Sequence, residues 1–420
     1  MSRLSAIELT RWRAFEACQR IELRPLTLFF GWNNTGKSAL LRALPLLADS
    51  ARLDAVTPLN LKGPAARGAT CRDVSWRGER KGLSLALEWA GDVAQRYEVL
   101  LMLDDDRPEH PRMRVERFSW HDGRAQVSGH WNGKDFNGRG MGFDVVGAWE
   151  GAATLRFAGL RPVSSDEEMI DRFLPLVRNI EALDGAVQWL ASVRAVPGVP
   201  VRIEEGIPRV IEADGRDVLD VLQHEPGVLD RVNEWLETHA NRSLELVNVS
   251  PGYVRPELRH AASNHAQRLA DHGEGLRQVL PVLAAVERAR HLSTSIQFGP
   301  RIIAAEDPES HLHPRLQRQL AWKLAEVAMD DDPPTMVLET HSQHLLLALQ
   351  LAVAQGINGR RLDPARVAMY WVEQGGDGVS SAAPMSVDAN GDLHGWPPDV
   401  YSDVVDMARE LTTHRWGLRR

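Results

Sequence analysis

The sequence has few cysteines and no long apolar run. Cys18 and Cys71 are the only cysteines among 420 residues, too few for a disulfide framework or a thiolate metal site. No stretch approaches the roughly 18 apolar residues that a membrane-spanning helix requires. The start of the chain, Met1 to Glu8, lacks the apolar core of a secretory signal. These absences predict a cytoplasmic protein that does not enter a membrane.

Basic residues are also in the minority. The 57 Asp and Glu outnumber the 49 Lys and Arg, which gives a net charge of −8. This balance argues against a protein that coats nucleic acid non-specifically. A local basic groove stays open, because phosphate contacts depend on where Lys and Arg cluster. With 43% hydrophobic and 25% charged residues, the composition is that of a globular protein with a buried core.

The first part of the chain predicts strands around a loop and a helix. Residues 3–9 alternate apolar and polar side chains, Leu26–Phe30 is an apolar strand, and apolar spacing predicts a helix over 37–47. Short alternating runs from Cys71 to Leu103 predict an antiparallel meander. We expect residues 1–160 to form an N-terminal lobe with an antiparallel β subdomain.

Helical signals dominate the middle of the chain. Ser165 followed three residues later by Glu168 is a capping-box pattern, and further helices are expected at 216–223 and 226–240. No heptads are sustained, so residues 161–245 are predicted to form a compact helical insertion and not a long coiled coil.

Strands and helices alternate in the last part, residues 246–420. The expected strands and helices are, in chain order, strand 301–305, helix 314–329, strand 335–339, helix 342–355 and strand 367–373. Such alternation predicts a largely parallel sheet with crossover helices. We expect this C-terminal lobe to end in a short β-hairpin and a helix. The fold class is therefore α/β, with a mixed sheet, crossover helices and an antiparallel β subdomain.

One motif has the spacing of a phosphate-binding loop. The run Gly31-Trp-Asn-Asn-Thr-Gly-Lys-Ser38 matches G-x-x-x-x-G-K-[ST] and lies between an apolar strand and an amphipathic helix. Backbone N–H groups of such a loop wrap phosphates, Lys37 reaches the β- and γ-phosphates, and the Ser38 hydroxyl binds Mg²⁺. A chance match is the alternative, and the strand–loop–helix context argues against it. The expected nucleotide-binding residues are Gly31, Asn33, Asn34, Thr35, Gly36, Lys37 and Ser38.

A second apolar strand, 301–305, ends in consecutive acids. Glu306 is predicted to hold Mg²⁺ together with Ser38, and Asp307 to orient the attacking water. Taken alone, such an acidic strand end is usually a solvated terminus. A phosphate loop in the same chain makes it the expected partner of that loop.

Two further elements are individually ambiguous. Gly273 and Gly275 precede an apolar helix, a geometry that suits either anion binding or simple helix capping. His341 follows the strand 335–339, where a lone histidine serves packing or capping more often than catalysis. A metal site made by His311, His313 and Glu309 is a weaker alternative, because no fourth ligand is evident.

In this order, the four elements resemble ABC-type ATPase heads of the structural-maintenance-of-chromosomes and DNA-repair kind. They resemble most the AAA-type ATPase domain of the OLD (overcoming lysogenization defect) family. Its E-E-P-E and H-L-H-P motifs are similar to Glu306-Asp-Pro-Glu-Ser-His-Leu-His-Pro314, and its E-T-H-S motif matches Glu339-Thr-His-Ser342. The resemblance covers the phosphate-loop end and nearly everything after about residue 185.

The resemblance implies a homodimer that sandwiches ATP, and it leaves a larger oligomer open. Gly273 and Gly275 of one subunit would complete the γ-phosphate site of the other, and His341 would sense the γ-phosphate. The chain departs from the family in two ways: the glycine signature lacks its serine, and Asp307 stands where a glutamate is expected. A shorter acid predicts slow hydrolysis, or a base role for Glu309.

Three functions remain open. The resemblance favours an ATP-dependent switch that acts on a partner effector protein, as in anti-phage defence. A DNA-engaging head is the first alternative, since Arg11, Arg13, Arg20 and Arg24 could line a groove, although they also suit a solvated strand face. An OLD-like nuclease with a Toprim domain is the second. The chain leaves little room for that domain, and Asp388 to Asp392 surround an Asn-Gly hairpin signal.

Overall fold

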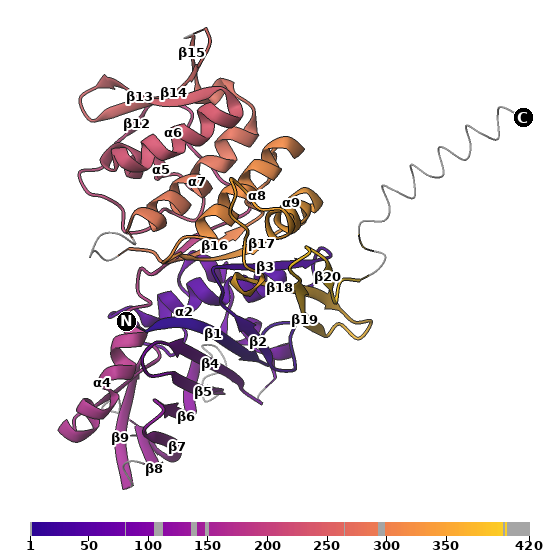
Figure 1. Ribbon diagram of the computed structural model, residues 1–420. Coiled ribbons are helices and arrows are strands. Elements are labelled where there is room, and N and C mark those ends of the chain that lie inside the picture. The colour runs from indigo at the N-terminus through magenta and orange to yellow at the C-terminus, as the bar shows by residue number, and fades with distance from the viewer. Residues whose placement is uncertain are drawn as a thin grey trace, which may run out of the picture.

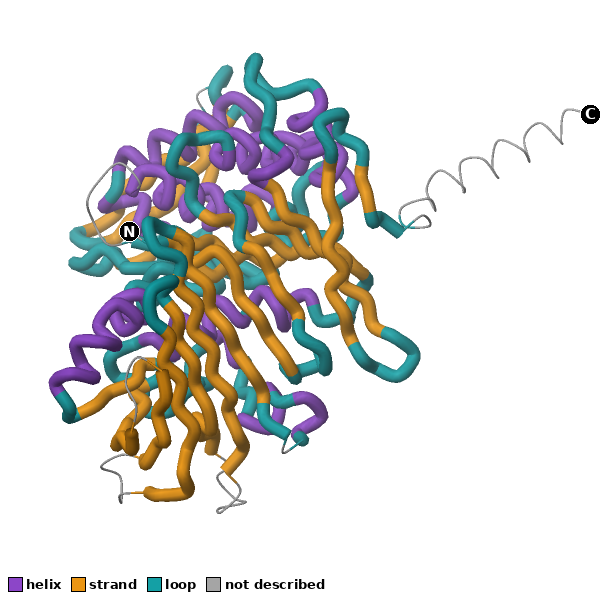
Figure 2. The backbone as a smooth tube through the Cα atoms, turned by 60° about the horizontal axis from the view of Figure 1, so that its bottom comes forward, coloured by secondary structure: helices purple, strands orange, loops and turns teal. Residues whose placement is uncertain are grey.

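The computed structural model describes residues 2–79, 81–104, 112–135, 141–147, 151–263, 265–292, 299–397 and 400. Two large sheets and a group of helices make up this part of the chain (Figure 1). In Figure 2 the strands, in orange, run from the middle of the molecule to its bottom, and most helices, in purple, lie towards the top. No helix in these ranges is long and apolar enough to cross a membrane.

The larger sheet has nine strands, all paired antiparallel, in the order β10-β9-β8-β7-β6-β5-β4-β1-β2. Its strands alternate buried and exposed side chains, as expected for a sheet with one face on the core and one in solvent. The bounds are β1 (Arg3–Thr10), β2 (Gln19–Glu22), β4 (Leu83–Ala90), β5 (Gln95–Asp104), β6 (Arg112–His121), β7 (Gln126–Asp135), β8 (Met141–Gly147), β9 (Gly151–Ala158) and β10 (Arg161–Ser164).

The second sheet has seven strands in the order β11-β16-β17-β3-β18-β19-β20. The first five are parallel, and the last two add an antiparallel edge. The central strands are buried along their whole length, which their apolar sequences require. The bounds are β3 (Leu26–Gly31), β11 (Val187–Leu190), β16 (Ile302–Glu306), β17 (Thr335–Glu339), β18 (Val367–Gln374), β19 (Ser380–Val387) and β20 (Leu393–His394).

This seven-stranded sheet separates two hydrophobic cores. Because successive side chains of a strand point to opposite faces, Phe29 and Val337 belong to the core shared with the nine-stranded sheet. Leu28, Phe30 and Leu338 belong to the other core, which the C-terminal helices cover. The phosphate-loop strand is therefore fixed from both sides, and its carboxyl end has little freedom to move.

Helices cover both cores. The helices α1 (Lys37–Leu41) and α2 (Ala43–Ala51) follow β3, and α4 packs on the nine-stranded sheet, where Phe173 meets Phe118 edge to face at 5.8 Å. A small sheet adjoins the other helices (Figure 1). The remaining bounds are α3 (Cys71–Val74), α4 (Glu167–Glu181), α5 (Val218–His224), α6 (Pro226–Ala240), α7 (Glu274–Leu292), α8 (Pro314–Ala328), α9 (Gln343–Ala354), β12 (Val201–Arg202), β13 (Arg242–Ser250), β14 (Tyr253–His260) and β15 (Ala266–Arg268).

The predicted fold class is confirmed: the protein is a mixed α/β fold with a large antiparallel sheet, a mixed sheet and helices. Three local predictions were wrong. The meander does not begin at Cys71, because Thr70 and Asp73 form a capping box that starts α3 there. The cap of α4 is Asp166, whose side chain accepts from the Met169 N–H, and not Ser165. The single helix over 37–47 is two helices, α1 and α2.

The three-part division of the chain stays a prediction. Residues 161–245 contribute β10 to the nine-stranded sheet and β11 to the seven-stranded sheet, besides α4, α5 and α6. The hairpin predicted near the C-terminus is β19–β20. The helix predicted after it lies outside the described residues.

Candidate nucleotide-binding site

Three neighbouring parallel strands bring the candidate residues to one edge of the seven-stranded sheet. β3, β17 and β16 are adjacent, and they end at Gly31, Glu339 and Glu306. Ligands of α/β proteins bind outside the carboxyl ends of such strands. The phosphate loop thus lies beside two acidic strand ends, of which the sequence predicted one.

The loop after β3 needs glycine at both ends of the motif. Gly31 has φ 145°, and a Cβ there would lie 2.0 Å from the Val372 carbonyl oxygen. Gly36 has φ 106°, and a Cβ would lie 2.9 Å from the Phe15 ring. L-residues rarely adopt these conformations, and neither position has space for a side chain. The two glycines let the backbone turn tightly into α1, which begins at Lys37.

Lys37 and Ser38 already have partners in this site. The buried Lys37 Nζ donates to the carbonyl oxygens of Gly31 at 3.1 Å and Trp32 at 2.7 Å, and burial lowers its pKa. The Ser38 hydroxyl donates to Glu339 Oε1 at 3.0 Å. Lys37 Nζ lies 3.9 Å from the same oxygen. The structure therefore joins the phosphate-loop side chains to Glu339.

Glu306 lies in the same edge but contacts different groups. Arg42 Nε donates to Glu306 Oε1 and Arg42 Nη2 to Glu306 Oε2, both at 2.6 Å. The Trp189 indole N–H donates to Oε1 at 3.1 Å, and Arg67 lies 3.5 Å from Oε2. The carboxylate is almost wholly buried, so these donors compensate its loss of water. The assignment of Mg²⁺ to Ser38 and Glu306 stays a prediction.

Glu339 is buried without full compensation. Its side chain is 8% exposed, and its Oε2 atom has no hydrogen-bond partner among the described residues. Burial raises the pKa of the Glu339 carboxyl to about 7. An ionised carboxylate in such a place requires a nearby positive charge.

Asp307 follows β16 in a left-handed conformation, with φ 43°. Its N–H donates to the Glu339 carbonyl at 2.9 Å, which joins the ends of β16 and β17. Burial raises the pKa of its carboxyl, and the charges of His341 and Lys37 oppose that shift. Burial, followed by the charge of Lys37, lowers the pKa of His341. Asp307, His341 and Lys37 thus act on one another electrostatically around the same space.

Glu309 is buried more deeply than Asp307. Its Oε1 accepts from the Thr340 hydroxyl at 2.5 Å and from the His341 N–H at 3.4 Å. Burial raises the pKa of the Glu309 carboxyl to about 7. These contacts place Glu309 against the backbone that carries His341.

A buried arginine that the sequence did not indicate fixes the end of β16. Arg194 Nη2 donates to the carbonyl oxygens of Glu306 at 2.5 Å and Asp307 at 3.0 Å, and Nη1 donates to the Gln278 carbonyl at 3.2 Å. The Gln278 side chain accepts from the Arg194 N–H at 3.0 Å and donates to its carbonyl at 2.6 Å. Arg194 therefore ties the acidic strand end to α7.

The two signature glycines have different surroundings at the start of α7. A Cβ at Gly275 would lie 2.6 Å from the His311 carbonyl oxygen, whereas nothing lies within 4 Å of a Cβ at Gly273. A Cβ at Gly273 or at Gly275 has no phosphate-loop residue of the same chain among its nearest neighbours. Their predicted role towards a second subunit stays a prediction.

A hollow of about 190 Å³ lies over the phosphate loop. Three of its nine lining residues, Lys37, Arg42 and Arg13, are basic, which suits an anion. Glu339 is the acid in the lining. The lining residues are Arg13, Asn34, Thr35, Gly36, Lys37, Ser38, Ala39, Arg42 and Glu339.

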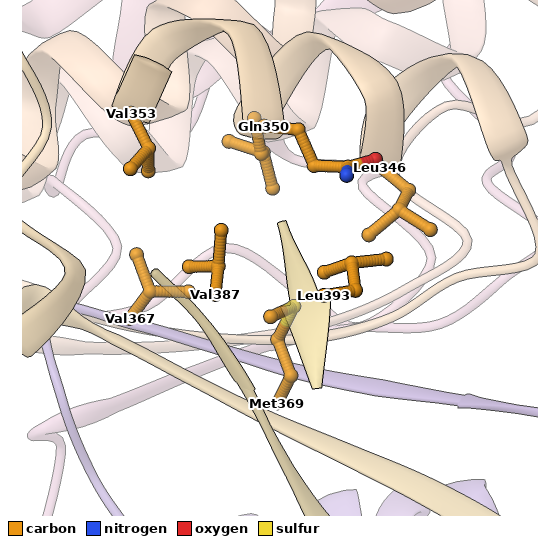
Figure 3. Close-up of a pocket in the computed structure, with 8 residues that line it drawn as sticks. Leu346, Gln350, Val353, Val367, Met369, Val387 and Leu393 are labelled. Carbon is orange, nitrogen blue, oxygen red and sulfur yellow. The ribbon is translucent and has the colours of Figure 1, made fainter. Parts of the chain in front are cut away.

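A second hollow, between α9 and the strands β18 to β20, is an apolar packing gap (Figure 3). Its volume is about 10 Å³, roughly the space of one water. Leu346, Val353, Met369 and Leu393 point into it, and Gln350 lies at its margin. It is too small and too apolar to hold a nucleotide.

The alternative metal residues are occupied elsewhere. His313 caps α8, where its ring accepts from the Arg315 N–H at 3.3 Å. Asp388 Oδ1 accepts from the N–H groups of Asn390 and Asp392 within the β19–β20 turn. Within the described ranges, no three His, Cys, Asp or Glu side chains form a group that could hold a metal.

Sequence reasoning missed Arg42, Trp189, Arg194 and Glu339 as site residues. The sequence positions of two of these residues could have indicated a role in the site. Arg42 lies four residues after Ser38, on the same side of the helical run, and Glu339 ends the strand that precedes His341. Trp189 lies in β11 and Arg194 in the loop after it. No local sequence pattern connects either residue with the site.

Comparison with known proteins supports an ATPase. Residues 221–346 match the family model described as AAA ATPase domain, and this segment contains Gly273, Glu306, Asp307 and His341. The SMC head domain from Thermotoga maritima is similar in structure with a TM-score of 0.42 and 11% identity, covering 91% of this chain and 98% of that one. No curated protein matches the chain. The family match supports an ATPase of the AAA type.

Proposed function

We propose that the protein binds ATP and Mg²⁺, hydrolyses ATP slowly, and closes as a homodimer around the nucleotide in the cytoplasm. The observation that carries this proposal is the meeting of a complete phosphate loop with Glu306, Asp307 and Glu339 at one sheet edge. The AAA ATPase match over 221–346 supports it.

Lys37 binds the phosphates in this proposal. In the structure its ammonium is bound to two neutral carbonyls, and hydrogen bonds between charged groups are stronger. Phosphate oxygens therefore displace the Gly31 and Trp32 carbonyls. Ser38 and the acid at the end of β16 or β17, Glu306 or Glu339, would hold Mg²⁺. The bound cation would neutralise charge on the β- and γ-phosphates.

Asp307 orients and deprotonates the attacking water. Glu309 is less suited, because one of its oxygens is bound to Thr340 and the side chain is buried. We assign Glu309 the role of positioning His341. The Asp307 carboxylate is one methylene shorter than glutamate, so it reaches the water less well and turnover is slow.

The proposed dimer rests on the resemblance and on Gly273, and the proposed partner rests on a dimer that persists because turnover is slow. Gly273 is open at the start of α7 and is assigned to the γ-phosphate of a second copy. A closed dimer that persists presents surfaces which the monomer lacks, and a partner effector protein that recognises them would be switched by ATP. A role in anti-phage defence rests on the OLD-like motifs alone.

The alternatives receive less support from the contacts. Arg20 pairs with Glu8 and Glu88, and Arg24 with Glu22, so carboxylates already face two of the arginines that would line a DNA groove. The nuclease alternative needs acids that meet at a metal, and Asp388 instead holds a turn. Nucleic acid remains a partner to test.

Nucleotide binding by Lys37→Ala tests the proposal. The variant loses a charge-assisted contact worth about 1.5–3 kcal/mol, so ATP affinity should fall about tenfold or more. Lys62→Ala, which removes an exposed lysine, is the matched control. Unchanged affinity in Lys37→Ala would refute the phosphate-loop assignment. A pull-down from the native host, with and without ATP, then identifies the partner.

A further inference from the structure

The acid expected to bind Mg²⁺ is already bound by donors on both oxygens. Both oxygens of Glu306 accept from the Arg42 guanidinium at 2.6 Å, Oε1 also accepts from Trp189, and Oε2 accepts from Arg67 at 3.5 Å, which occupies the roughly four acceptor sites of a carboxylate. Arg42 in turn lies over the Trp189 ring, 5.9 Å from its centroid. To ligate a cation, Glu306 would have to give up a bidentate ion pair in a buried place, where breaking such a pair is costly.

The other acidic strand end is arranged in the opposite way. Glu339 Oε1 accepts from the Ser38 hydroxyl at 3.0 Å, while Oε2 is buried and has no hydrogen-bond partner among the described residues. Glu339 and Ser38 both line the hollow over the phosphate loop, and Glu306 is not in its lining. One oxygen therefore orients the carboxylate against the loop, and the other is available to a ligand.

We propose that Glu339, and not Glu306, is the protein carboxylate that binds the divalent cation of the bound nucleotide, together with the Ser38 hydroxyl oxygen. Arg42 is a positioning residue that keeps Glu306 out of the coordination shell. This inference rests on the proposed ATP binding and adds the metal ligand to it.

Cation chemistry agrees with this donor set. Mg²⁺ binds oxygen, keeps several waters, and commonly uses one or two carboxylates together with substrate phosphates. A hydroxyl and a single carboxylate beside a phosphate loop meet that need. The Ser38 hydroxyl can donate its proton to Glu339 Oε1 and still offer a lone pair to the cation. The uncompensated Oε2 gains the positive charge that its burial requires.

The first experiment compares nucleotide affinity with Mg²⁺ and with EDTA. Fluorescent ATP is titrated into the wild type, Glu339→Gln, and the double variant Arg42→Gln/Glu306→Gln, which replaces the buried ion pair by two neutral amides. Glu339→Gln should lose about tenfold or more of the affinity that Mg²⁺ adds, a loss typical of disturbed metal sites. The double variant lacks a basic residue of the hollow and should bind nucleotide more weakly in both conditions. The ratio of its affinity with Mg²⁺ to its affinity with EDTA should nevertheless equal that of the wild type.

A second experiment detects the ligand directly. In Glu339→Cys, the softer Cd²⁺ should support nucleotide binding better than Mg²⁺ does, because a thiolate prefers soft cations. Glu306→Cys should show no such preference. Cys18 and Cys71 are present in both variants, so their contribution cancels.

The outcomes separate this inference from the proposed function. If the wild type binds no nucleotide with Mg²⁺ or with EDTA, the proposed function fails. If nucleotide binds and the double variant loses the Mg²⁺ gain while Glu339→Gln keeps it, the assignment of Glu339 is wrong. A cadmium preference in Glu306→Cys and not in Glu339→Cys overturns it equally. Nucleotide binding in EDTA by each variant shows that the site is folded.

Discussion

Replacing Arg194 by methionine tests whether the acidic strand end depends on a single buried guanidinium. The arginine is 2% exposed and donates to the carbonyls of Glu306, Asp307 and Gln278. Methionine has a similar reach and no donor, so Arg194→Met leaves three carbonyls without this partner. Each buried carbonyl that loses its donor costs about 1–3 kcal/mol, or about 3–9 kcal/mol in total.

An opposing effect reduces this cost. Burial lowers the pKa of Arg194 to about 10, which means that the site disfavours the charged form. At about 1.4 kcal/mol per pKa unit, removing the charge returns about 3 kcal/mol. The difference between the two effects is a predicted decrease of about 0–6 kcal/mol in the free energy of unfolding of Arg194→Met.

Urea denaturation followed by circular dichroism measures this change. The control is Arg172→Met, which removes an exposed pair with Glu168 one turn away and should cost about 0.5 kcal/mol or less. ATP hydrolysis should fall by about tenfold or more in Arg194→Met, since Asp307 is no longer held at a fixed position. A variant as stable as the control, with wild-type hydrolysis, would refute the anchoring role of Arg194.

Three further predictions concern the dimer, the base and pH. Gly273→Arg should bind ATP and stay a monomer in size-exclusion chromatography, because a Cβ at this position has nothing of its own chain within 4 Å, whereas the arginine would block a second copy. ATP-dependent dimers of this variant would contradict the sandwich. Asp307→Asn keeps the shape and removes the base, so phosphate release should fall and ATP should trap the dimer. Burial raises the pKa of half-buried Asp49 from 3.8 to about 6, so its contribution to stability is present below pH 3.8 and is lost as pH rises through 6. The melting temperature of Asp49→Asn should therefore be higher than that of the wild type at pH 8 and equal to it at pH 3.5. The same difference in melting temperature at both pH values would contradict a raised pKa of Asp49.

The sequence predicted the parts of the fold that depend on short-range patterns. A fully apolar strand, a glycine turn and an amphipathic helix lie within 25 residues around Gly31, so their arrangement follows from local sterics and apolar spacing. The strand 335–339 has the bounds that were expected. The sequence analysis missed α3 because it read residues from Cys71 onwards as a weakly alternating strand. The capping box of Thr70 and Asp73 instead stabilises a four-residue helix there.

Contacts between distant residues could not be predicted in the same way. Glu339 meets Ser38 across 301 positions and Arg42 meets Glu306 across 264. A sequence motif indicates which side chains are acidic, but not which acid has free oxygens. The prediction that Glu306 binds Mg²⁺ used only its position at a strand end, whereas the structure distinguishes two strand ends by their donors.

The contacts of Arg194 also bear on how the proposed ATPase could signal. Asp307 cannot shift towards bound nucleotide unless Arg194 follows it or a buried hydrogen bond is lost, at about 1–3 kcal/mol. Arg194 is in turn held on both backbone groups by the Gln278 side chain, and Gln278 lies one turn after Glu274, the first residue of α7. A shift of Asp307 that keeps these hydrogen bonds therefore requires the start of α7 to follow the end of β16. Gly273 directly precedes that helix, so Arg194 and Gln278 connect Asp307, the residue proposed to orient water, with the surface proposed to meet the second copy.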